Sequence, residues 1–319
     1  MPRVAAIDCG TNSIRLLVAD VTVREDGSRW LRDVHREMRI VRLGQGVDAT
    51  GQLAPEAIER TRAALADYTA VLRRKGAERV RMTATSATRD AGNREDFFGM
   101  VRATLGAEAE VISGDEEARL SFTGAVGDLE PEDGPFVVTD IGGGSTEVVV
   151  GTWDGVRAEI TAARSVDVGC VRITERCLHD DPPTAEQRTE AERVIAEILA
   201  EAFDAVDVRA ARTWVGVAGT ITTLAAVAQD LPEYDSDRVH LYRMSLDTVR
   251  ETSDRLLAMS HDDRAALGPM HPGRVDVING GALVLQSLAD EFAKRAGITE
   301  LIASEHDILD GIALSLTAS

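Results

Sequence analysis

The chain has 319 residues, of which 44% are hydrophobic and 28% are charged. These fractions are typical of a globular protein and exclude a disordered or collagen-like chain. The length suits two domains of about 150 residues each. With 35 basic and 54 acidic residues, the net charge is −19. Nucleic acids and anionic membrane surfaces attract basic proteins, so we expect neither as a partner.

The cellular location is predicted from three features of the sequence. Its three cysteines lack the spacing of metal ligands or of a disulfide framework. The N-terminus lacks the apolar segment of a signal peptide, and no apolar run reaches the length of a membrane span. We therefore expect a cytoplasmic protein.

The first predicted domain, residues 1–128, opens with short apolar runs at 4–7 and 14–18 that flank a small polar turn. This pattern is typical of two strands joined as a hairpin. Apolar spacing then predicts these elements in order: strands at 30–42, a helix at 56–73, a strand at 80–85, a helix at 94–105, a short strand at 110–112 and a helix at 115–122.

The second predicted domain, residues 129–319, begins in a stretch at 128–134 that is rich in Asp, Glu, Pro and Gly. The sequence predicts strands at 136–138 and 148–150, further strands to about residue 166, and a strand at 214–217. It predicts helices at 184–206, after 219–220, and at 246–259, 277–295 and 305–316. Strands and helices alternate in both halves. The predicted fold class is therefore α/β, with two domains.

An internal repeat relates the two halves. At one constant offset and without a gap, Asp8 aligns with Asp140, Gly10 with Gly142, Ser13 with Ser145 and Val18 with Val150. Each half thus begins with a strand, an Asp, a glycine turn, a Ser and a second strand. A match at the start of both predicted domains indicates a duplicated domain.

The two glycine turns have the composition of phosphate-binding loops. Glycine lets a backbone approach an anion closely, and successive N–H groups form an anion-binding nest. We expect contacts to phosphate from Gly10, Thr11, Asn12, Ser13, Gly142, Gly143, Gly144 and Ser145. The carboxylates of Asp8 and Asp140 precede the turns and are placed to hold Mg²⁺ opposite the phosphate. The alternative is a pair of ordinary tight hairpins.

Two further segments have both a structural and a functional interpretation. Gly219 and Thr220 lie between an apolar strand and a helix, where a helix N-terminus favours an anion; strand–helix packing alone also explains them. The segment 113–119 begins with a capping Ser and continues with acidic residues. It is either an ordinary capped helix or the source of a general base for a phosphoryl reaction.

Taken together, the segments resemble one family, that of the exopolyphosphatases and guanosine pentaphosphate phosphohydrolases. The similar segments are 7–13, 85–89, 113–119, 140–147, 169–172, 218–220 and 274–278, and the resemblance covers about residues 3 to 317. It implies two ribonuclease-H-like domains of the actin-like ATPase type, with the active site in the cleft between them.

The resemblance also implies an activity and roles for residues. The activity is hydrolysis of the terminal phosphate of inorganic polyphosphate, with Mg²⁺ as cofactor. Glu117 matches the catalytic base of the family, and Asp140 matches a residue of its metal site. Glu147 falls in the same site as a second catalytic residue, and Arg89 matches a basic residue that contacts phosphate.

Several alternatives stay open. The same motifs suit guanosine pentaphosphate as substrate, an actin-like nucleotide-binding assembly protein, or an inactive sensor. Longer family members carry further C-terminal domains, so we expect this chain to prefer short polyphosphates, unless a homodimer extends the groove. Leu309 stands where an Arg is often found, which leaves the role of that Arg open here.

Overall fold

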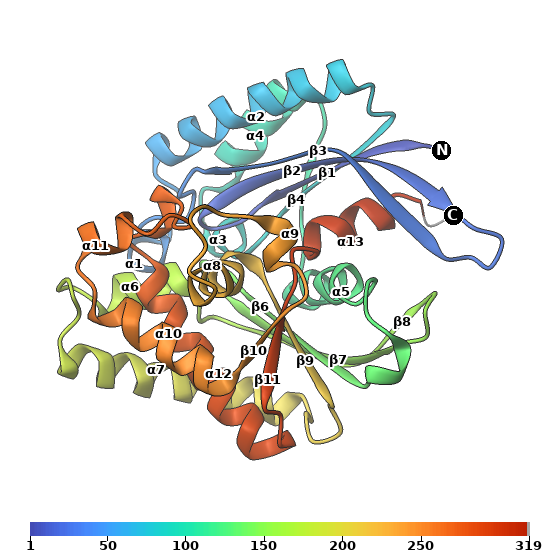
Figure 1. The fold of residues 1–319 in the computed structure, drawn as a ribbon. Coiled ribbons are helices and arrows are strands. Elements are labelled where there is room, and N and C mark those ends of the chain that lie inside the picture. The colour runs from blue at the N-terminus through green and yellow to red at the C-terminus, as the bar shows by residue number, and fades with distance from the viewer. Residues whose placement is uncertain (318–319) are drawn as a thin grey trace.

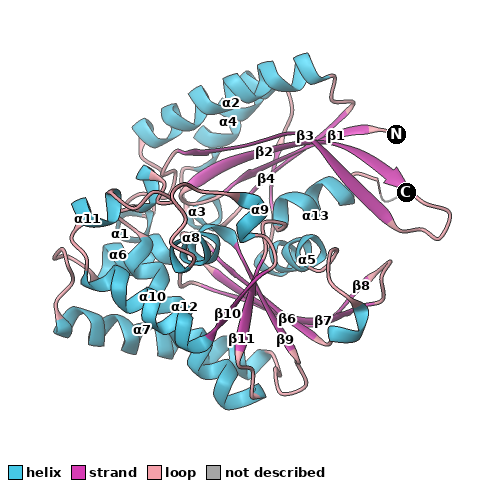
Figure 2. Ribbon diagram, viewed as in Figure 1, coloured by secondary structure: helices cyan, strands magenta, loops and turns pink. Residues whose placement is uncertain are grey.

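The computed structural model describes residues 1–317 and contains two mixed β-sheets with helices packed on them (Figures 1 and 2). The first sheet has the strand order β3-β2-β1-β4-β5. Its strands are β1 (Arg3–Cys9), β2 (Ser13–Val23), β3 (Arg29–Ile40), β4 (Arg79–Ala84) and β5 (Ala109–Val111). β1 and β2 are antiparallel, whereas β1 pairs with β4 in parallel.

The second sheet has the strand order β10-β11-β9-β6-β7-β8. Its strands are β6 (Phe136–Ile141), β7 (Thr146–Trp153), β8 (Ala158–Val166), β9 (Thr213–Val217), β10 (Tyr242–Ser245) and β11 (Glu300–Ala303). Every residue of β6 is buried because side chains alternate between two covered faces. Phe136 and Val138 face one apolar cluster, and Val137 and Ile141 face another.

The helices cover both faces of the two sheets. They are α1 (Val47–Thr50), α2 (Pro55–Lys75), α3 (Ser86–Asp90), α4 (Arg94–Leu105), α5 (Gly114–Ala125), α6 (Cys170–Cys177), α7 (Ala185–Ala205), α8 (Ala218–Ala228), α9 (Ser236–Val239), α10 (Leu246–Ala258), α11 (His261–Ala265), α12 (Ile278–Ala296) and α13 (Ile308–Ser315). Local signals set several boundaries. Pro55 is at the start of α2, and Gly76 ends it with φ 67°.

The internal repeat is present in three dimensions. Each sheet contains an antiparallel hairpin next to a parallel strand: β1, β2 and β4 in the first sheet, and β6, β7 and β9 in the second. The turns also match, because the N–H of Gly10 donates to the Ser13 carbonyl at 2.9 Å and the N–H of Gly142 donates to the Ser145 carbonyl at 3.0 Å. The expected α/β fold with two related domains is confirmed.

Two helices lie on the sheet of the other half of the chain. α5 precedes residue 128, but its Phe122 packs with Phe136 of the second sheet. α13 is the C-terminal helix, but its Ile312 packs with Val4 of the first sheet. A division at residue 128 therefore separates the strands of the two sheets, while the helices are exchanged between them.

The two exchanged helices cross in close contact. A Cβ on Gly124 of α5 would lie 1.8 Å from the carbonyl oxygen of Asp307, and a Cβ on Gly311 of α13 would lie 2.0 Å from that of Leu120. Only glycine fits at these two points. This contact links the two segments of the chain that run between the sheets, one from α5 to β6 and the other from β11 to α13.

The predicted secondary structure differs from the structure in a few places. The predicted helix at 305–316 begins only at Ile308, because Asp307 caps it and β11 precedes it. The short helices α1, α3, α6, α9 and α11 and the strands β10 and β11 were not predicted, since they are too short to show a clear period. Among the described residues, we find no helix with the length and apolar character needed to cross a bilayer.

Candidate active site

The two glycine turns meet in a cleft between the sheets. Its cavity has a volume of about 70 Å³ and is lined by these predicted site residues: Asp8, Gly10, Thr11, Asn12, Ser13, Glu117, Asp140, Gly142, Gly143, Ser145, Gly219 and Thr220. Gly144 lines the neighbouring cavity behind the turn. The hydroxyl groups of Thr11 and Ser86 lie 2.8 Å apart and fix the first turn against α3.

The backbone of both turns offers free donors. The N–H groups of Thr11, Asn12, Gly143 and Gly144 donate no hydrogen bond to another group among residues 1–317. The N-terminus of α8 (at Gly219) borders the same cavity. Unpaired N–H groups and a helix N-terminus that converge on one cavity form a suitable site for an anion.

The carboxylates of the two repeats lie in different surroundings. Asp8 is paired across the hairpin with Arg15, and its Oδ2 accepts hydrogen bonds from that guanidinium at 3.1 and 2.8 Å. Its Oδ1 is buried and has no hydrogen-bond partner in the described part of the chain. Asp140 is paired across its hairpin with Glu147 and accepts a hydrogen bond from Ser121 at 2.7 Å. The repeat thus places Arg15 where the second domain has Glu147.

Glu117 and Glu147 complete the acidic group. Glu117 lies in the first turn of α5 and is 8% exposed. Its Oε2 accepts a hydrogen bond from Arg89 at 2.6 Å. Glu147 is 1% exposed, and its Oε1 accepts a hydrogen bond from Ser165 at 2.7 Å. Glu147 therefore lies behind the cavity wall, next to Asp140.

Burial raises the pKa of all four carboxyl groups. Loss of hydration is the largest cause in each, since a buried charge is poorly solvated. It raises the pKa of Glu117 to about 7, against the opposing effect of Arg89. It raises the pKa of Asp140 to about 6, with repulsion from Asp307 as the next cause. A bound cation would relieve this repulsion.

Arg89 lies beside Glu117 and is not one of the residues that line the cavity. Its Nη1 donates to Glu117 and, at 3.1 Å, to the carbonyl of Ile112. In this structure its direct contact is therefore with the carboxylate of Glu117, and its predicted contact with phosphate stays a prediction.

Two arginines of the cleft were not among the predicted site residues. Arg274 lies against Gly219, where an added Cβ would come within 1.4 Å of its Nη1, and it makes no hydrogen bond or ion pair with a side chain among residues 1–317. Arg15 pairs with both Asp8 and Asp307. Two signals could have found them: the similarity of the segment 274–278, and the alignment of Arg15 with Glu147 in the repeat.

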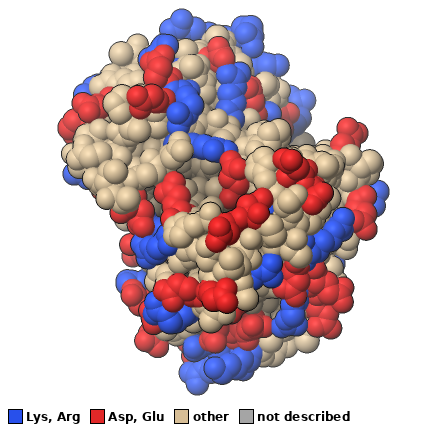
Figure 3. Space-filling model, turned by 90° about the vertical axis from the view of Figure 1, so that its left-hand side faces the viewer, with Lys and Arg blue, Asp and Glu red and all other residues tan. Residues whose placement is uncertain are grey.

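A larger cavity of about 600 Å³ adjoins the cleft and shares Arg15, Gly219 and Arg274 with it. Its other lining residues include Tyr234, Met270, His271, Pro272, Glu305 and Leu309. Leu309 is also packed in the apolar cluster beneath α13. Figure 3 shows acidic and basic side chains intermixed on one face of the molecule, without a continuous basic surface.

Two domains with the same hairpin arrangement, and a cleft between them that is lined by glycine turns and carboxylates, define the actin-like ATPase fold class. The chain belongs to the Ppx/GppA phosphatase family, whose model matches residues 21–316.

Individual relatives agree with this membership. The chain is 58% identical to "Exopolyphosphatase 2" of Mycobacterium tuberculosis (strain H37Rv), over 99% of each chain. The crystal structure of an exopolyphosphatase-like protein matches with a TM-score of 0.92 and 43% identity, over 99% of this chain and 97% of that one. The Ppx/GppA family member of Aquifex aeolicus matches with a TM-score of 0.78 and 30% identity, over 100% and 99% of the chains.

Proposed function

We propose that this chain is an exopolyphosphatase, which transfers the terminal phosphoryl group of inorganic polyphosphate to water. The observation that carries the proposal is the convergence of two phosphate-type turns and a buried carboxyl group, Glu117, on one cavity. The close similarity to a relative named as an exopolyphosphatase supports the same substrate class.

The terminal phosphate would bind to the two turns. Free N–H groups of Thr11, Asn12, Gly143 and Gly144 provide donors for its oxygens, and the unpaired guanidinium of Arg274 adds positive charge at the rim. Phosphoryl transfer depends mainly on position and electrostatics, because little covalent chemistry is left for the protein. Donors fixed before the reaction stabilise the charge on the phosphoryl oxygens without reorganisation.

Glu117 would act as the general base. The water oxygen attacks the terminal phosphorus, Glu117 takes a proton from that water, and the bond to the bridging oxygen breaks. The products are orthophosphate and a polyphosphate shorter by one unit. A carboxyl group with a pKa of about 7 is well matched to proton transfer near neutral pH. Arg89 would hold the carboxylate in position.

Asp8 and Asp140 fit the hard oxygen ligands that Mg²⁺ requires. The Oδ1 of Asp8 is buried without a partner, which is a cost that a cation would remove. When bound, Mg²⁺ would supply positive charge that offsets the charge of the phosphoryl oxygens. Glu147, which is buried beside Asp140 in the hairpin, would add negative charge that favours the cation.

This assignment predicts that Mg²⁺ stabilises the protein more at high pH than at low pH. The folded-state pKa values of Asp8, Glu117, Asp140 and Glu147 are raised. The folded state therefore favours the protonated carboxyl groups. This stabilising contribution is full below their ordinary pKa values and is lost as pH rises through the raised ones. Repulsion then remains, and Mg²⁺ relieves it.

Melting temperatures with chelator and with excess Mg²⁺, measured at pH 5 and pH 8, check this prediction. We expect a clear rise with Mg²⁺ at pH 8 and a small one at pH 5. Equal rises at the two pH values would show that Mg²⁺ binds away from these carboxyl groups.

We further propose a preference for short polyphosphates. A long chain would leave the cleft past Arg15 and Arg36, which line the larger cavity. Arg15 is already paired with Asp8 and Asp307, and Arg36 with Asp33 and Asp310 at 2.7 and 2.5 Å. Each free cation near a polyanion adds affinity by releasing counterions. Arg274, the third arginine of this cavity, also borders the glycine turns and would be occupied by the terminal phosphates. Paired cations add little, so phosphates beyond the last few should contribute weakly.

The expected result is that kcat/KM changes little between chains of tens and of hundreds of phosphates. Phosphate release is measured over this size series at equal concentrations of chain ends. A steep rise with length for a monomer would contradict the proposal, because additional free cations would then have to contact the polymer.

A second candidate substrate is guanosine pentaphosphate. The larger cavity has the volume of a small-molecule site and lies beside the phosphate turns. Tyr234, Met270 and His271 give it apolar and aromatic walls that suit a purine better than a string of phosphates. Two of its three arginines, Arg15 and Arg36, are paired with carboxylates, which favours the same interpretation.

The deciding experiment is phosphate release from short polyphosphate and from guanosine pentaphosphate, side by side, with Mg²⁺ present. Faster release from polyphosphate supports the first function, and faster release from guanosine pentaphosphate supports the second. Release from neither substrate would contradict both and favour a binding or sensing protein.

A further inference from the structure

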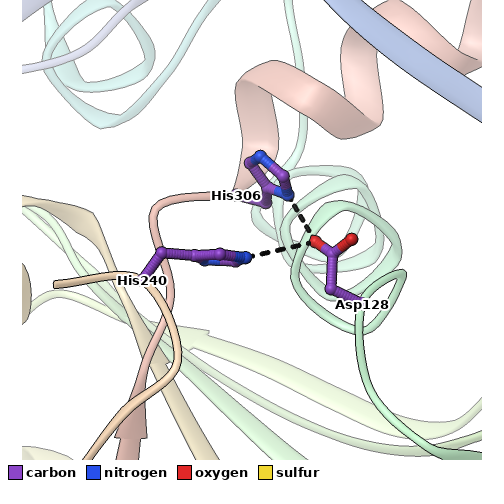
Figure 4. A group of neighbouring side chains, drawn as sticks. All are labelled: Asp128, His240 and His306. Carbon is purple, nitrogen blue, oxygen red and sulfur yellow. Dashed lines mark hydrogen bonds and ion pairs between the residues drawn. The ribbon is translucent and has the colours of Figure 1, made fainter. Parts of the chain in front are cut away.

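Three side chains outside the active-site cavities converge on one point: Asp128, His240 and His306 (Figure 4). Asp128 follows α5, His240 follows α9, and His306 lies between β11 and α13. The Nδ1 of His306 and the Nε2 of His240 lie 2.5 and 3.4 Å from the Oδ2 of Asp128. One ligand atom of each residue lies within 4.8 Å of the other two.

We propose that Asp128, His240 and His306 form a binding site for a divalent transition-metal ion, with Zn²⁺ as the best match. Zinc binds imidazole nitrogen and carboxylate oxygen at about 2.0–2.2 Å, so neighbouring ligand atoms of a tetrahedral site lie roughly 3.3 Å apart. The 3.4 Å separation of His240 and Asp128 already has this value. The contact of His306 with Asp128 would have to lengthen by less than about 1 Å.

The ligand types separate this site from the proposed Mg²⁺ site in the cleft. Two imidazoles and one carboxylate suit zinc and its neighbours among the transition metals, whereas Mg²⁺ prefers oxygen ligands in an octahedral arrangement. None of the three residues lines either cavity of the active site. The site therefore lies outside the catalytic cleft.

The backbone around the cluster is fixed by hydrogen bonds. The hydroxyl of Ser304 donates a hydrogen bond to the carbonyl of His306 at 2.9 Å and accepts one from the N–H of His306 at 3.1 Å.

Zinc binding would remove one existing hydrogen bond of the cluster. The Nδ1 of His240 accepts from the N–H of Glu305 at 3.3 Å. Zinc on Nε2 of His240 would leave the ring proton on Nδ1, so this long hydrogen bond would be lost. That loss should lower the affinity, but it does not block the ligand atoms.

The cluster is also accessible to an ion. The side chains of Asp128, His240 and His306 are 42%, 23% and 37% exposed. Three protein ligands that face solvent leave room for water as the fourth ligand. Zinc requires both imidazoles in the deprotonated form, so the ion would displace the protons that they now share with Asp128.

Bound zinc would link the two segments of the chain that run between the sheets, from α5 to β6 and from β11 to α13. Asp128 ends the segment that leads from α5 to β6, and His306 begins the segment that leads from β11 back to α13. Asp307 follows His306 and pairs with Arg15, which holds Asp8 in the cleft. The ion would thus fix the start of α13 and, through it, one wall of the cleft.

The test is a titration of the chelator-treated full chain with Zn²⁺, and with Co²⁺ as a spectroscopic probe, in excess Mg²⁺ so that oxygen sites are occupied. We expect one Zn²⁺ per chain, a visible Co²⁺ absorption band and a rise in melting temperature. His240→Ala and His306→Ala should each weaken binding at least about tenfold, since loss of even a residue that only supports a ligand costs 10–100-fold.

His261→Ala is the matched control, because His261 is half exposed and also lies beside two carboxylates, those of Asp262 and Asp276. This variant should bind Zn²⁺ like the parent. Circular dichroism checks the fold of each variant, and His240→Asn replaces His240→Ala if the latter is unfolded. The proposal is overturned if the parent binds no Zn²⁺, or if the parent and both cluster variants bind it equally. In either case Asp128, His240 and His306 would form only a group of ion pairs.

Discussion

Replacing Glu117 by Gln is expected to lower the rate of phosphate release by about 10²–10⁴-fold, the usual effect of removing a general base. Gln has nearly the same shape but cannot take a proton from water at neutral pH. Its amide oxygen can still accept the hydrogen bond that Arg89 now donates to the carboxylate. The substitution should therefore preserve the fold while it removes the proposed chemistry.

Glu116→Gln is the matched control for this experiment. Glu116 is the preceding residue of the same helix, but its side chain is 44% exposed and pairs with Arg81 at 2.6 Å. The control should keep its activity within about twofold of the parent. Measurements of kcat and KM for both variants, with melting temperatures, separate lost catalysis from lost folding. Near-parental activity of Glu117→Gln would assign the base to another group.

The parts of the fold that local residues determine could be predicted from the sequence. The turn at 10–13 and its repeat at 142–145 combine small residues with a preceding Asp, and the structure gives both the same hydrogen bond. Helix α2 was predicted within a few residues, because its apolar residues recur at helical spacing and Gly76 marks its end. These signals depend only on neighbouring residues.

The exchange of α5 and α13 between the sheets could not be predicted in this way. It depends on contacts between residues far apart in the chain, such as Phe122 with Phe136 and Ile312 with Val4. Both helices show only an apolar face in the sequence, and either of the two sheets offers a surface for such a face. The approach of Gly124 to Asp307 likewise has no local pattern.

The candidate site shows the same limit. Its glycine turns and carboxylates follow from motifs, whereas the partners of its charges do not. The sequence did not indicate that Arg89 pairs with Glu117, and its contact with phosphate stays a prediction. Asp307 received no role, yet it shares Arg15 with Asp8. The first pair joins residues of two different helices, and the pair of Arg15 with Asp307 forms only when the two halves of the chain meet.

Replacing Asp140 by Asn is expected to lower the rate on the order of 10²-fold and to raise the Mg²⁺ concentration needed for half-maximal activity. A neutral amide is a weaker ligand than a carboxylate for a hard cation. The same change removes one of several buried negative charges that repel one another. The metal-free variant should therefore melt no lower than the parent, although its rise in melting temperature with Mg²⁺ should shrink.

These opposite effects distinguish a metal ligand from a residue that only supports the fold. A structural role predicts loss of stability together with loss of activity, whereas a ligand role predicts loss of activity and of the Mg²⁺ response alone. Asp204→Asn, on the exposed face of α7, controls for the loss of one negative charge and should leave both measurements unchanged. If the Mg²⁺ titration of Asp140→Asn matches that of the parent, Asp140 does not bind the metal. Asp8 then becomes the residue to test, because its Oδ1 is buried without a partner among residues 1–317.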